Sequence, residues 1–510
     1  MLMKLNYFLA TFAAMLFSAQ QNVVIHSGTP TEPTIAVHPN NPNIVVAAAN
    51  INNYYYSTNG GLNWTRKTLS STFGVWGDPV MVFDNTGNLF FGHLSNPSSG
   101  SWLDRIVVQK STDGGATYNN GSFAGLNGKQ HDKQWLAVDS NNNLYMTWTQ
   151  FDSYGSTNPN DKTAILFSKS VDGGNSWSNA IKINQIDGDC VDEDNTVEGA
   201  VPAIGPNNEI YVSWAGPAGL VFDRSFDGGN TWLTNDIKIA DIPGGWDFMI
   251  PGLDRSNGLP ITACDISNGP NRGTIYVNWS DQRNGTDNTD VFLSKSTDGG
   301  NTWTSPVKVN NDNSGKHQFL TWMTIDQTNG NLYFVFYDRR SYTDNRTDVY
   351  IAKSTDGGQS FVNMKVNQTT FTPNAGIFFG DYTNIAVRNG IVRPIWGDQV
   401  GGASRIVTAN INDNEILQTS EDSSDHNISF YPNPVVNEAY ISYKLHSLSQ
   451  VEINIYDMSG KMVHQILKQK QTYGKYIQKI EVDLLKLKKG NYVCELKVDG
   501  TTKKSVKFIK

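Results

Sequence analysis

The stretch STDGGNTW, residues 296–303, decides the fold, because close copies of it recur along the 510-residue chain. The other copies are STNGGLNW, STDGGATY, SVDGGNSW, SFDGGNTW and STDGGQSF, which begin at residues 57, 111, 170, 225 and 354. In each copy the Asp can cap its own tight turn, the glycines can take positive φ, and the last aromatic residue can pack on the returning strand. Three copies depart from the pattern, with Asn59 in place of Asp and with Tyr118 and Phe361 in place of Trp. The repeat predicts six β-hairpin turns of one kind.

Four strand-like segments surround each turn, for example residues 319–326, 332–337, 348–354 and 362–367. They alternate between apolar and polar residues or are continuously apolar, as sheet strands are. The same order of strands and turns begins near seven positions. These are Pro33, Pro79, Trp135, Val201, Ile261, Phe319 and Thr383. The chain therefore contains seven repeat units, although only six of them carry the turn motif.

The six turns are identified as Asp boxes of the BNR repeat, and the region resembles the sialidase-like β-propellers. This resemblance implies an all-β fold in which each unit forms one blade. We expect seven blades; six blades, the usual sialidase number, is the alternative. The seventh unit, residues 383–410, lacks a box and a fourth strand, and residues 22–27 form a lone strand. We predict that this N-terminal strand completes the last blade and closes the ring, leaving no free edge.

The chain divides into four parts. Residues 1–20, with an early Lys4 and an apolar run, are expected to be a signal peptide, and residues 21–411 the propeller. Residues 412–426 are polar and acidic, as in a linker, and residues 427–510 return to strand-like alternation.

The last part resembles the sorting domain of Bacteroidetes-type type IX secretion substrates, through YPNP at 431–434, Asp457, Gly460, Lys461 and the terminal lysines. The resemblance implies a small Ig-like β-sandwich that the secretion machinery binds. It also implies export across the outer membrane, followed by release or attachment at the cell surface. An ordinary Ig-like module would explain the strands but not this combination of motifs.

Composition restricts the partners of the large domain. Residues 427–510 hold 14 Lys against 7 Asp or Glu, while the whole chain has a net charge of −8, so the first 426 residues are strongly acidic. This acidity argues against nucleic acid as a ligand. The three cysteines, Cys190, Cys264 and Cys494, lack metal-type spacing. Buried free thiols are expected, with a Cys190–Cys264 disulfide as the alternative.

The loops of the repeat predict which face carries function. The turns between the first and second strands are short and lie on the same side as the Asp boxes. The loops between the second and third strands and the links between blades lie on the other side, and they are long and varied, as at residues 93–104, 150–163 and 241–259. Variable loops on a rigid scaffold mark a functional face, so we interpret the Asp boxes as structural.

Acidic residues stand just before the innermost strands on this variable face. They are Glu32, Asp78, Asp132, Glu198 and Asp381, with His131 and His317 nearby. We take Asp78, Asp132, Glu198 and Asp381 as candidate catalytic carboxylates, because a ring of carboxyls can supply a general acid and a base for glycoside hydrolysis. Tyr382 is a candidate nucleophile, as are Tyr337 and Tyr342. The alternative is that the carboxylates cap strand ends or pair with lysines such as Lys133.

Candidate substrate-binding residues lie in the same loops. They are Arg283 in WSDQR, Arg339 and Arg340 in FYDRR, and the aromatic residues Trp76 and Trp246, with Trp102 as a further one. Arginines can hold acidic groups and tryptophans can stack on sugar rings. The alternatives are local ion pairs with Asp281 and Asp338, and Trp residues that only plug loops. The Arg-Ile-Pro signature of sialidases is absent, so the sialidase arginine triad cannot be placed.

The loop DGDCVDEDNTVE, residues 187–198, is dense in carboxylates and is a candidate metal site. Asp187, Asp189, Asp192 and Asp194 offer the hard oxygen ligands that calcium prefers, although the spacing is not that of an EF-hand. A solvated acidic loop is the alternative, and no cofactor is required.

Three functions remain open on the sequence. The first is a secreted or surface-attached propeller that recognises an extracellular glycan or glycoprotein without necessarily cleaving it. The second is a glycoside hydrolase of the exo-α-sialidase type. The third is a protein-binding or adhesion propeller.

Overall fold

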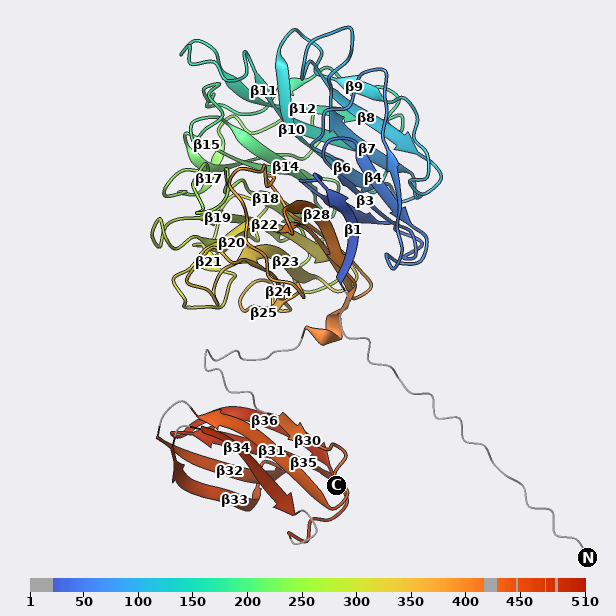
Figure 1. The fold of residues 1–510 in the computed structure, drawn as a ribbon. Helices are drawn as coiled ribbons and strands as arrows, with labels where there is room; N and C mark the ends of the chain where they lie inside the picture. Colours follow the sequence, from blue (N-terminus) through green and yellow to red (C-terminus); the bar gives the residue numbers. More distant parts are fainter. Residues whose placement is uncertain (1–21, 417–428, 446–447, 473, 482–484) are drawn as a thin grey trace, which may run out of the picture. The chain divides into compact units, whose positions relative to one another are not determined.

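The computed structural model describes residues 22–416, 429–445, 448–472, 474–481 and 485–510, and nearly all of its regular structure is β (Figure 1). A single 3₁₀ helix, η1(Asp413–Glu415), occurs among these residues. The predicted signal peptide and most of the predicted linker lie outside the described residues. The chain divides into two compact units between residues 418 and 419.

The described residues of the first unit form seven sheets, six of them built from four consecutive strands. The strands of the first three sheets are β2(Thr34–Val37), β3(Val45–Ala49), β4(Asn53–Ser57), β5(Thr65–Thr68); β6(Val80–Phe83), β7(Leu89–Leu94), β8(Ile106–Ser111), β9(Ser122–Ala124); and β10(Gln130–Val138), β11(Leu144–Phe151), β12(Thr163–Ser170), β13(Ile181–Lys182). Those of the next three are β14(Glu198–Ile204), β15(Ile210–Gly216), β16(Gly219–Ser225), β17(Ile237–Ala240); β18(Ile261–Cys264), β19(Ile275–Asp281), β20(Asp290–Ser296), β21(Val307–Lys308); and β22(Gln318–Asp326), β23(Asn331–Asp338), β24(Asp348–Ser354), β25(Val362–Lys365). This arrangement matches the units read from the sequence.

The seventh sheet joins the two ends of the propeller region. It contains β26(Asn384–Arg388), β27(Ile391–Val400) and β28(Ala403–Ala409), with β29(Ile411–Asn412) beside β27 and β1(Asn22–Gly28) beside β28. β1 runs antiparallel to β28, with Asn22 opposite Ala409 and Gly28 opposite Ser404. The predicted closure by the N-terminal strand is therefore confirmed.

The first strands of the seven sheets form a closed inner ring. Each contacts the first strand of the next sheet, and β2 contacts both β6 and β26. Blades built in this way place the start of every inner strand at one end of the central channel. Loops that are far apart in the sequence therefore meet there.

The Asp boxes form hydrogen-bonded turns at the opposite ends of the strands. In the box at 296–303, Ser296 Oγ donates to Asp298 Oδ1 at 2.7 Å, and Asp298 accepts from Thr302 N at 3.0 Å and from Thr302 Oγ1 at 2.6 Å. Gly299 and Gly300 have φ of +73° and +90°, a conformation that side chains disfavour. The motif residues thus satisfy one another within the turn.

Basic residues just before the boxes connect neighbouring blades. Lys169 Nζ donates to the carbonyl of Gly228 at 2.8 Å, and Lys295 Nζ donates to that of Gly357 at 2.6 Å. In both cases the acceptor is a box glycine of the next blade along the chain. The repeated Lys-Ser pair that precedes the box therefore serves packing between blades.

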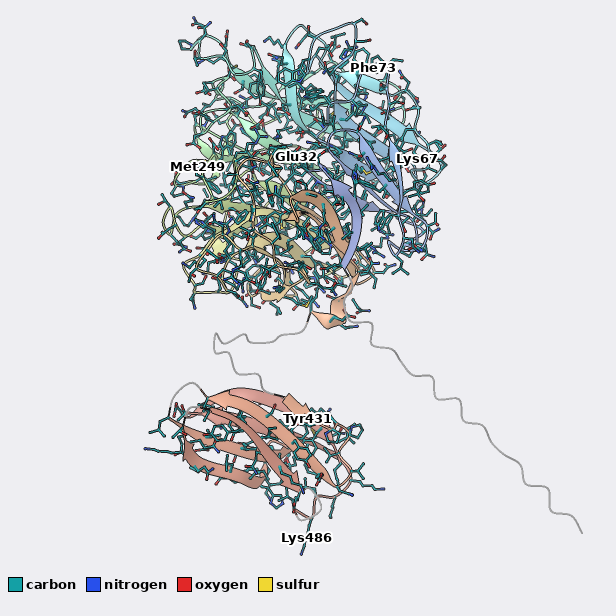
Figure 2. The ribbon with its side chains drawn as sticks, in the orientation of Figure 1. Glu32, Lys67, Phe73, Met249, Tyr431 and Lys486 are labelled. Atoms are coloured by element: carbon teal, nitrogen blue, oxygen red, sulfur yellow. The ribbon has the colours of Figure 1, made fainter. Side chains whose placement is uncertain are left out.

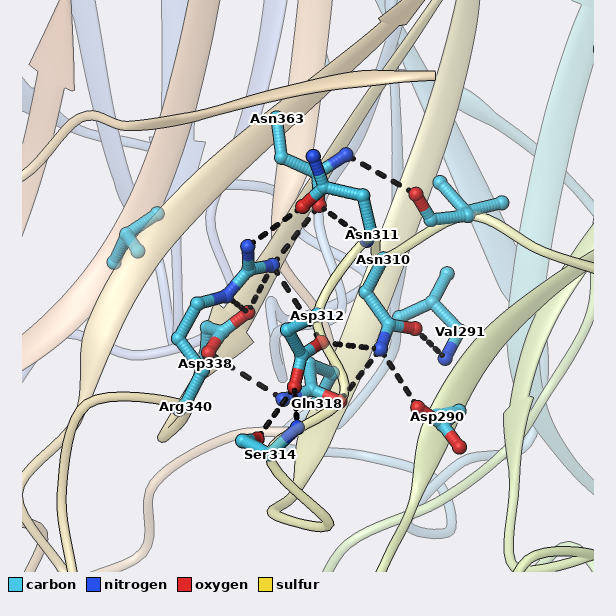
Figure 3. Close-up of polar contacts among 12 residues, drawn as sticks. Asp290, Val291, Asn310, Asn311, Asp312, Ser314, Gln318, Asp338, Arg340 and Asn363 are labelled. Carbon is cyan, nitrogen blue, oxygen red and sulfur yellow. Dashed lines mark hydrogen bonds and ion pairs between the residues drawn. The ribbon is translucent and has the colours of Figure 1, made fainter. Parts of the chain in front are cut away.

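Asparagines at the ends of outer strands make a second recurrent contact (Figure 3). Asn310 Oδ1 accepts from the N–H of Val291 at 2.9 Å, while its Nδ2 donates to Asp290 Oδ1 at 2.6 Å and to Gln318 Oε1 at 2.8 Å. Asn367 accepts in the same way from the N–H of Val349 at 2.8 Å. These side chains hold the strand ends and the following loop together.

The second unit is a small β-sandwich. One sheet has the order β30(Ser429–Tyr431), β31(Glu438–Leu445), β34(Gly474–Glu481), and the other β33(Met462–Gln471), β32(Ser449–Asp457), β35(Asn491–Val498), β36(Thr501–Ile509). Ile441 and Tyr443 of the first sheet share one core with Ile453 and Leu496 of the second. The expected C-terminal β-sandwich is confirmed.

Candidate functional site

The start of the inner strands gathers acidic side chains at the centre of the propeller. Glu32 precedes β2, Asp78 precedes β6, Asp132 lies in β10, Glu198 begins β14 and Asp381 precedes β26, and all five are buried. Glu32, labelled in Figure 2, lies toward the middle of the propeller. The ring brings these residues together from five blades.

Lys133 connects the carboxylates of different blades. Its Nζ lies 2.7 Å from Asp381 Oδ2 and 3.2 Å from Asp78 Oδ2. Arg255, from the loop before β18, also pairs with Asp381. The Asp381 N–H donates to Glu32 Oε1 at 3.1 Å. The sequence offered two alternative interpretations of these carboxylates, one as a converging set and one as partners of lysines. In the structure both occur, because the carboxylates converge and Lys133 pairs with two of them.

The backbone at this centre is strained. Glu32, Asp78 and Lys133 have φ of +53°, +50° and +49°. Side chains other than glycine rarely adopt this left-handed conformation, which costs about 1–3 kcal/mol at each position. Leu320 in β22 has a similar φ of +48°, so this conformation recurs among the inner strands of the propeller.

Burial divides the carboxyls into two electrostatic classes. Burial raises the pKa of Asp132 to about 7, a rise that Lys133 opposes and Asp78 increases. Burial also raises the pKa of Glu32 and of Glu198 well above the ordinary value. At Asp381 burial acts in the same direction, but Lys133 and Arg255 outweigh it and lower the pKa. The two cations therefore favour the charged form of Asp381, while burial favours the protonated forms of Asp132, Glu32 and Glu198.

A cavity of about 590 Å³ opens above this centre. Glu32, Asp78, Asp132, Lys133 and Arg255 are among its lining residues. Its size lies within the range of pockets for small ligands.

Aromatic side chains surround the same cavity. Trp76, Trp102 and Phe378 line it and are 40%, 38% and 39% exposed. Trp102 packs edge-on against Tyr154, with ring centroids 5.4 Å apart. The Arg255 guanidinium lies 5.0 Å from the centre of the Phe378 ring. The cavity thus combines exposed aromatic faces with a charged floor.

Tyr382 and Trp246, two further site residues predicted from the sequence, are buried. Tyr382 is buried, its hydroxyl has no hydrogen-bond partner among the described residues, and burial raises its pKa well above the ordinary value. Such a hydroxyl is a weak nucleophile unless a ligand changes its surroundings. Trp246 is also buried, and its Nε1 donates to the Thr196 carbonyl at 3.1 Å, as expected for a Trp that plugs a loop.

The arginine candidates make local contacts. Arg283 pairs with Asp281, as in the alternative interpretation of WSDQR. Arg340 likewise pairs with Asp338 of FYDRR at 2.7 Å (Figure 3). Arg339 is 3% exposed; its Nε donates to Thr347 Oγ1 at 3.0 Å and its Nη1 to the Pro251 carbonyl at 2.7 Å. In the described part of the chain, none of these three arginines lines the 590 Å³ cavity. Their guanidinium groups are engaged in holding loops.

The carboxylates of the acidic loop have separate partners. Asp187 pairs with Lys182, Asp189 Oδ1 accepts from Thr196 Oγ1 at 3.1 Å, Asp192 Oδ2 accepts from the Tyr154 hydroxyl at 2.6 Å, and Asp194 Oδ1 accepts from the N–H of Asp247 at 2.8 Å. Within the described residues no three His, Cys, Asp or Glu side chains gather as a metal site would require. Calcium binding by this loop stays a prediction.

Sequence reasoning missed Asn50 and underrated Lys133 and Arg255. Asn50 Oδ1 accepts from the N–H of Asp78 at 2.8 Å, and its Nδ2 donates to Glu32. Nothing in the sequence marks a single Asn in a β3–β4 turn. The sequence placed Arg255 on the variable face only as one of several arginines, and Lys133 only as an alternative partner of the carboxylates, because spacing does not show which cation meets the acids. The three cysteines are free and buried, in agreement with the preferred expectation.

Comparison with known families identifies the C-terminal part of the chain. Residues 429–510 match the secretion system C-terminal sorting domain. The protein is accordingly secreted or attached to the outer-membrane surface. Within the described residues, no helix combines the length and the apolar character needed to cross a membrane.

Solved structures similar to this chain include several carbohydrate-active proteins. They include the Hadza microbial sialidase Hz136 (15% identity, TM-score 0.42, 73% of this chain and 74% of that chain) and Penicillium chrysogenum α-L-arabinanase (13%, 0.44, 78% and 100%). An ulvan lyase of family PL25 is also similar (13%, 0.46, 77% and 96%). A search of curated protein sequences finds no match.

Proposed function

We propose that this exported protein binds an extracellular glycan in the 590 Å³ cavity at the mouth of its central channel. The observation that carries the proposal is the lining of that cavity, where exposed Trp76, Trp102 and Phe378 surround a floor containing Asp78 and Lys133. Aromatic faces bury the apolar faces of sugar rings, while carboxylates and cations hydrogen-bond to sugar hydroxyls. The acidic centre is costly for folding, which favours a role in binding.

The test is a glycan-array screen of the full chain, followed by calorimetry with the best ligand. We expect Trp76→Ala and Trp102→Ala each to weaken binding at least about tenfold, the scale of one lost aromatic contact. Phe226→Ala is the matched control, because Phe226 is 62% exposed in the turn of an Asp box. Absence of any glycan ligand, or equal affinity in all three variants, would contradict the proposal and favour a protein-binding propeller.

Glycoside hydrolysis is the second candidate, and the raised pKa of Asp132 favours it. A carboxyl whose pKa is raised to about 7 can donate a proton near neutral pH, and the charged Asp381 belongs to the same ion-paired centre. If the protein turns over its ligand, Asp132→Asn should slow the reaction at least about a hundredfold while binding persists. The measurement is the release of reducing sugars from the ligand that the array identifies. Equal rates for the variant and the unmodified protein would exclude Asp132 as the acid.

A further inference from the structure

A second, smaller cavity adjoins the centre. Its volume is about 30 Å³, and Asp192, Glu198 and Asp247 line it together with Lys133 and Arg255, which also line the large cavity. A cavity of about 10–15 Å³ by this measure already holds one water molecule. The space therefore fits a group of one or two heavy atoms, but not a sugar ring.

Glu198 faces this space with an unused acceptor. The residue is 1% exposed, it lines the cavity, and its Oε1 has no hydrogen-bond partner among the described residues. An unpaired buried polar atom costs about 1–3 kcal/mol, so such atoms usually have a partner in the functional state. The missing partner must be a hydrogen-bond donor if Glu198 is a carboxylate.

The charges around Glu198 favour a cationic donor. Burial and the neighbouring Asp192 raise the pKa of Glu198, and burial and Asp194 raise the pKa of Asp247 to about 6. The two cations that line this space, Lys133 and Arg255, are already paired with Asp381. Four acidic side chains, Asp381 included, line this space against these two cations, so a positive charge of the ligand fits better here than a carboxylate does.

We propose that this small cavity receives the protonated amino group of an amino sugar, so that the preferred ligands are glycans with free rather than acetylated amines. The inference rests on the proposed function, because the sugar ring itself occupies the larger cavity. An ammonium group adds one heavy atom, which the small cavity accommodates. An acetamido group adds four and carries no charge, so it fits poorly and leaves the acids unpaired.

The experiment compares two oligosaccharides that differ only in acetylation. Calorimetry measures binding of the full chain to β-1,4-linked glucosamine oligomers and to N-acetylglucosamine oligomers of the same length. We expect at least about tenfold tighter binding of the free amine. Glu198→Gln should reduce that preference to less than about threefold. Glu193→Gln is the matched control, since Glu193 lies in the same loop with an exposed side chain, and it should keep the preference.

Each outcome bears on one proposal. Equal binding of the two oligomers, or binding of some other glycan alone, would overturn the amine site but leave glycan binding intact. Loss of all glycan binding across the array would overturn the proposed function itself. If Glu198→Gln fails to fold, as judged by thermal unfolding, Asp247→Asn serves as the second variant, and an unchanged preference in that variant overturns the amine site.

Discussion

Asp298 and Asp132 are the same residue type at the two ends of the propeller, and they differ in burial and in pKa. Asp298 is exposed in an Asp box, where hydrogen bonds from Thr302 and Ser296 lower its pKa to about 2. Asp132 is buried at the channel, where burial raises its pKa to about 7. The charged form is stabilised by the fold at the first position and opposed by it at the second.

This difference shows which carboxylates stabilise the fold and which oppose it. The Asp boxes satisfy their own hydrogen bonds, so they stabilise the turn that contains them. The central acids crowd one another, and Glu198 lacks a partner for one oxygen within the described chain. Residues that oppose folding in this way are expected where a ligand is bound. The variants below test the contrast, beginning with the largest expected effect.

Replacing Lys133 by Met should destabilise the channel most. The change leaves Asp78 and Asp381 without the cation that lies 3.2 and 2.7 Å from them. Removing one partner of a buried ion pair costs about 3–5 kcal/mol, which urea unfolding at pH 7 would measure.

The control is Lys129→Met, because Lys129 pairs with Asp152 at 2.6 Å on the surface, with side chains 42% and 30% exposed. An exposed pair contributes about 0–1 kcal/mol, so this variant should unfold almost as the unmodified protein does. Equal stability of the two variants would show that the central charges are not desolvated, and the contrast between the faces would fail.

The sequence predicted the box face well and the channel only in part. Box contacts are local, between residues up to four positions apart in 296–303, so spacing alone revealed them. The closure by β1 followed from counting strands. Lys133 and Asp381 are 248 positions apart, and their contact depends on how seven blades close into a ring. No periodicity in the sequence predicts a contact across that distance. The arginines of WSDQR and FYDRR were candidates on chemical grounds alone, and their side chains make other contacts instead of lining the cavity.

Replacing Asp132 by Asn should have a smaller effect that depends on pH. An Asp in the unfolded chain has a pKa of about 3.9, whereas that of folded Asp132 is raised to about 7. The folded protein thus binds a proton that the unfolded chain releases, and this stabilising contribution is fully present below about pH 4 and is lost as pH rises through 7. Asn does not titrate, so the Asp132→Asn variant does not lose this stability as pH rises.

Thermal unfolding at pH 4.5 and pH 8.5 measures this effect. We expect the Tm of Asp132→Asn, relative to the unmodified protein, to rise by on the order of a few °C between the two pH values. Lys133, Asp78 and Asp192 act on the same carboxyl, so Asp192→Asn should reduce the shift. A difference in Tm that is the same at both pH values would mean that Asp132 ionises as a surface Asp does.

Replacing Asp298 by Ala should have the smallest effect and leave ligand binding unchanged. The variant loses the acceptor for Ser296 Oγ and for both donors of Thr302. Loss of a comparable capping acceptor costs about 0.5–2 kcal/mol, and five further boxes still hold the ring. Urea unfolding at pH 7 measures this loss.

The pH dependence of Asp298→Ala should run opposite to that of the channel variant. The folded pKa of about 2 lies below the unfolded value, so Asp298 stabilises the fold above about pH 4 and this contribution is lost as pH falls toward 2. The stability difference between Asp298→Ala and the unmodified protein should therefore be larger at pH 7 than at pH 2.5, while glycan affinity stays within about twofold. If Asp298→Ala weakened binding as much as Trp76→Ala does, the boxes would belong to the ligand site, and the separation of a stabilising face from a binding face would be wrong.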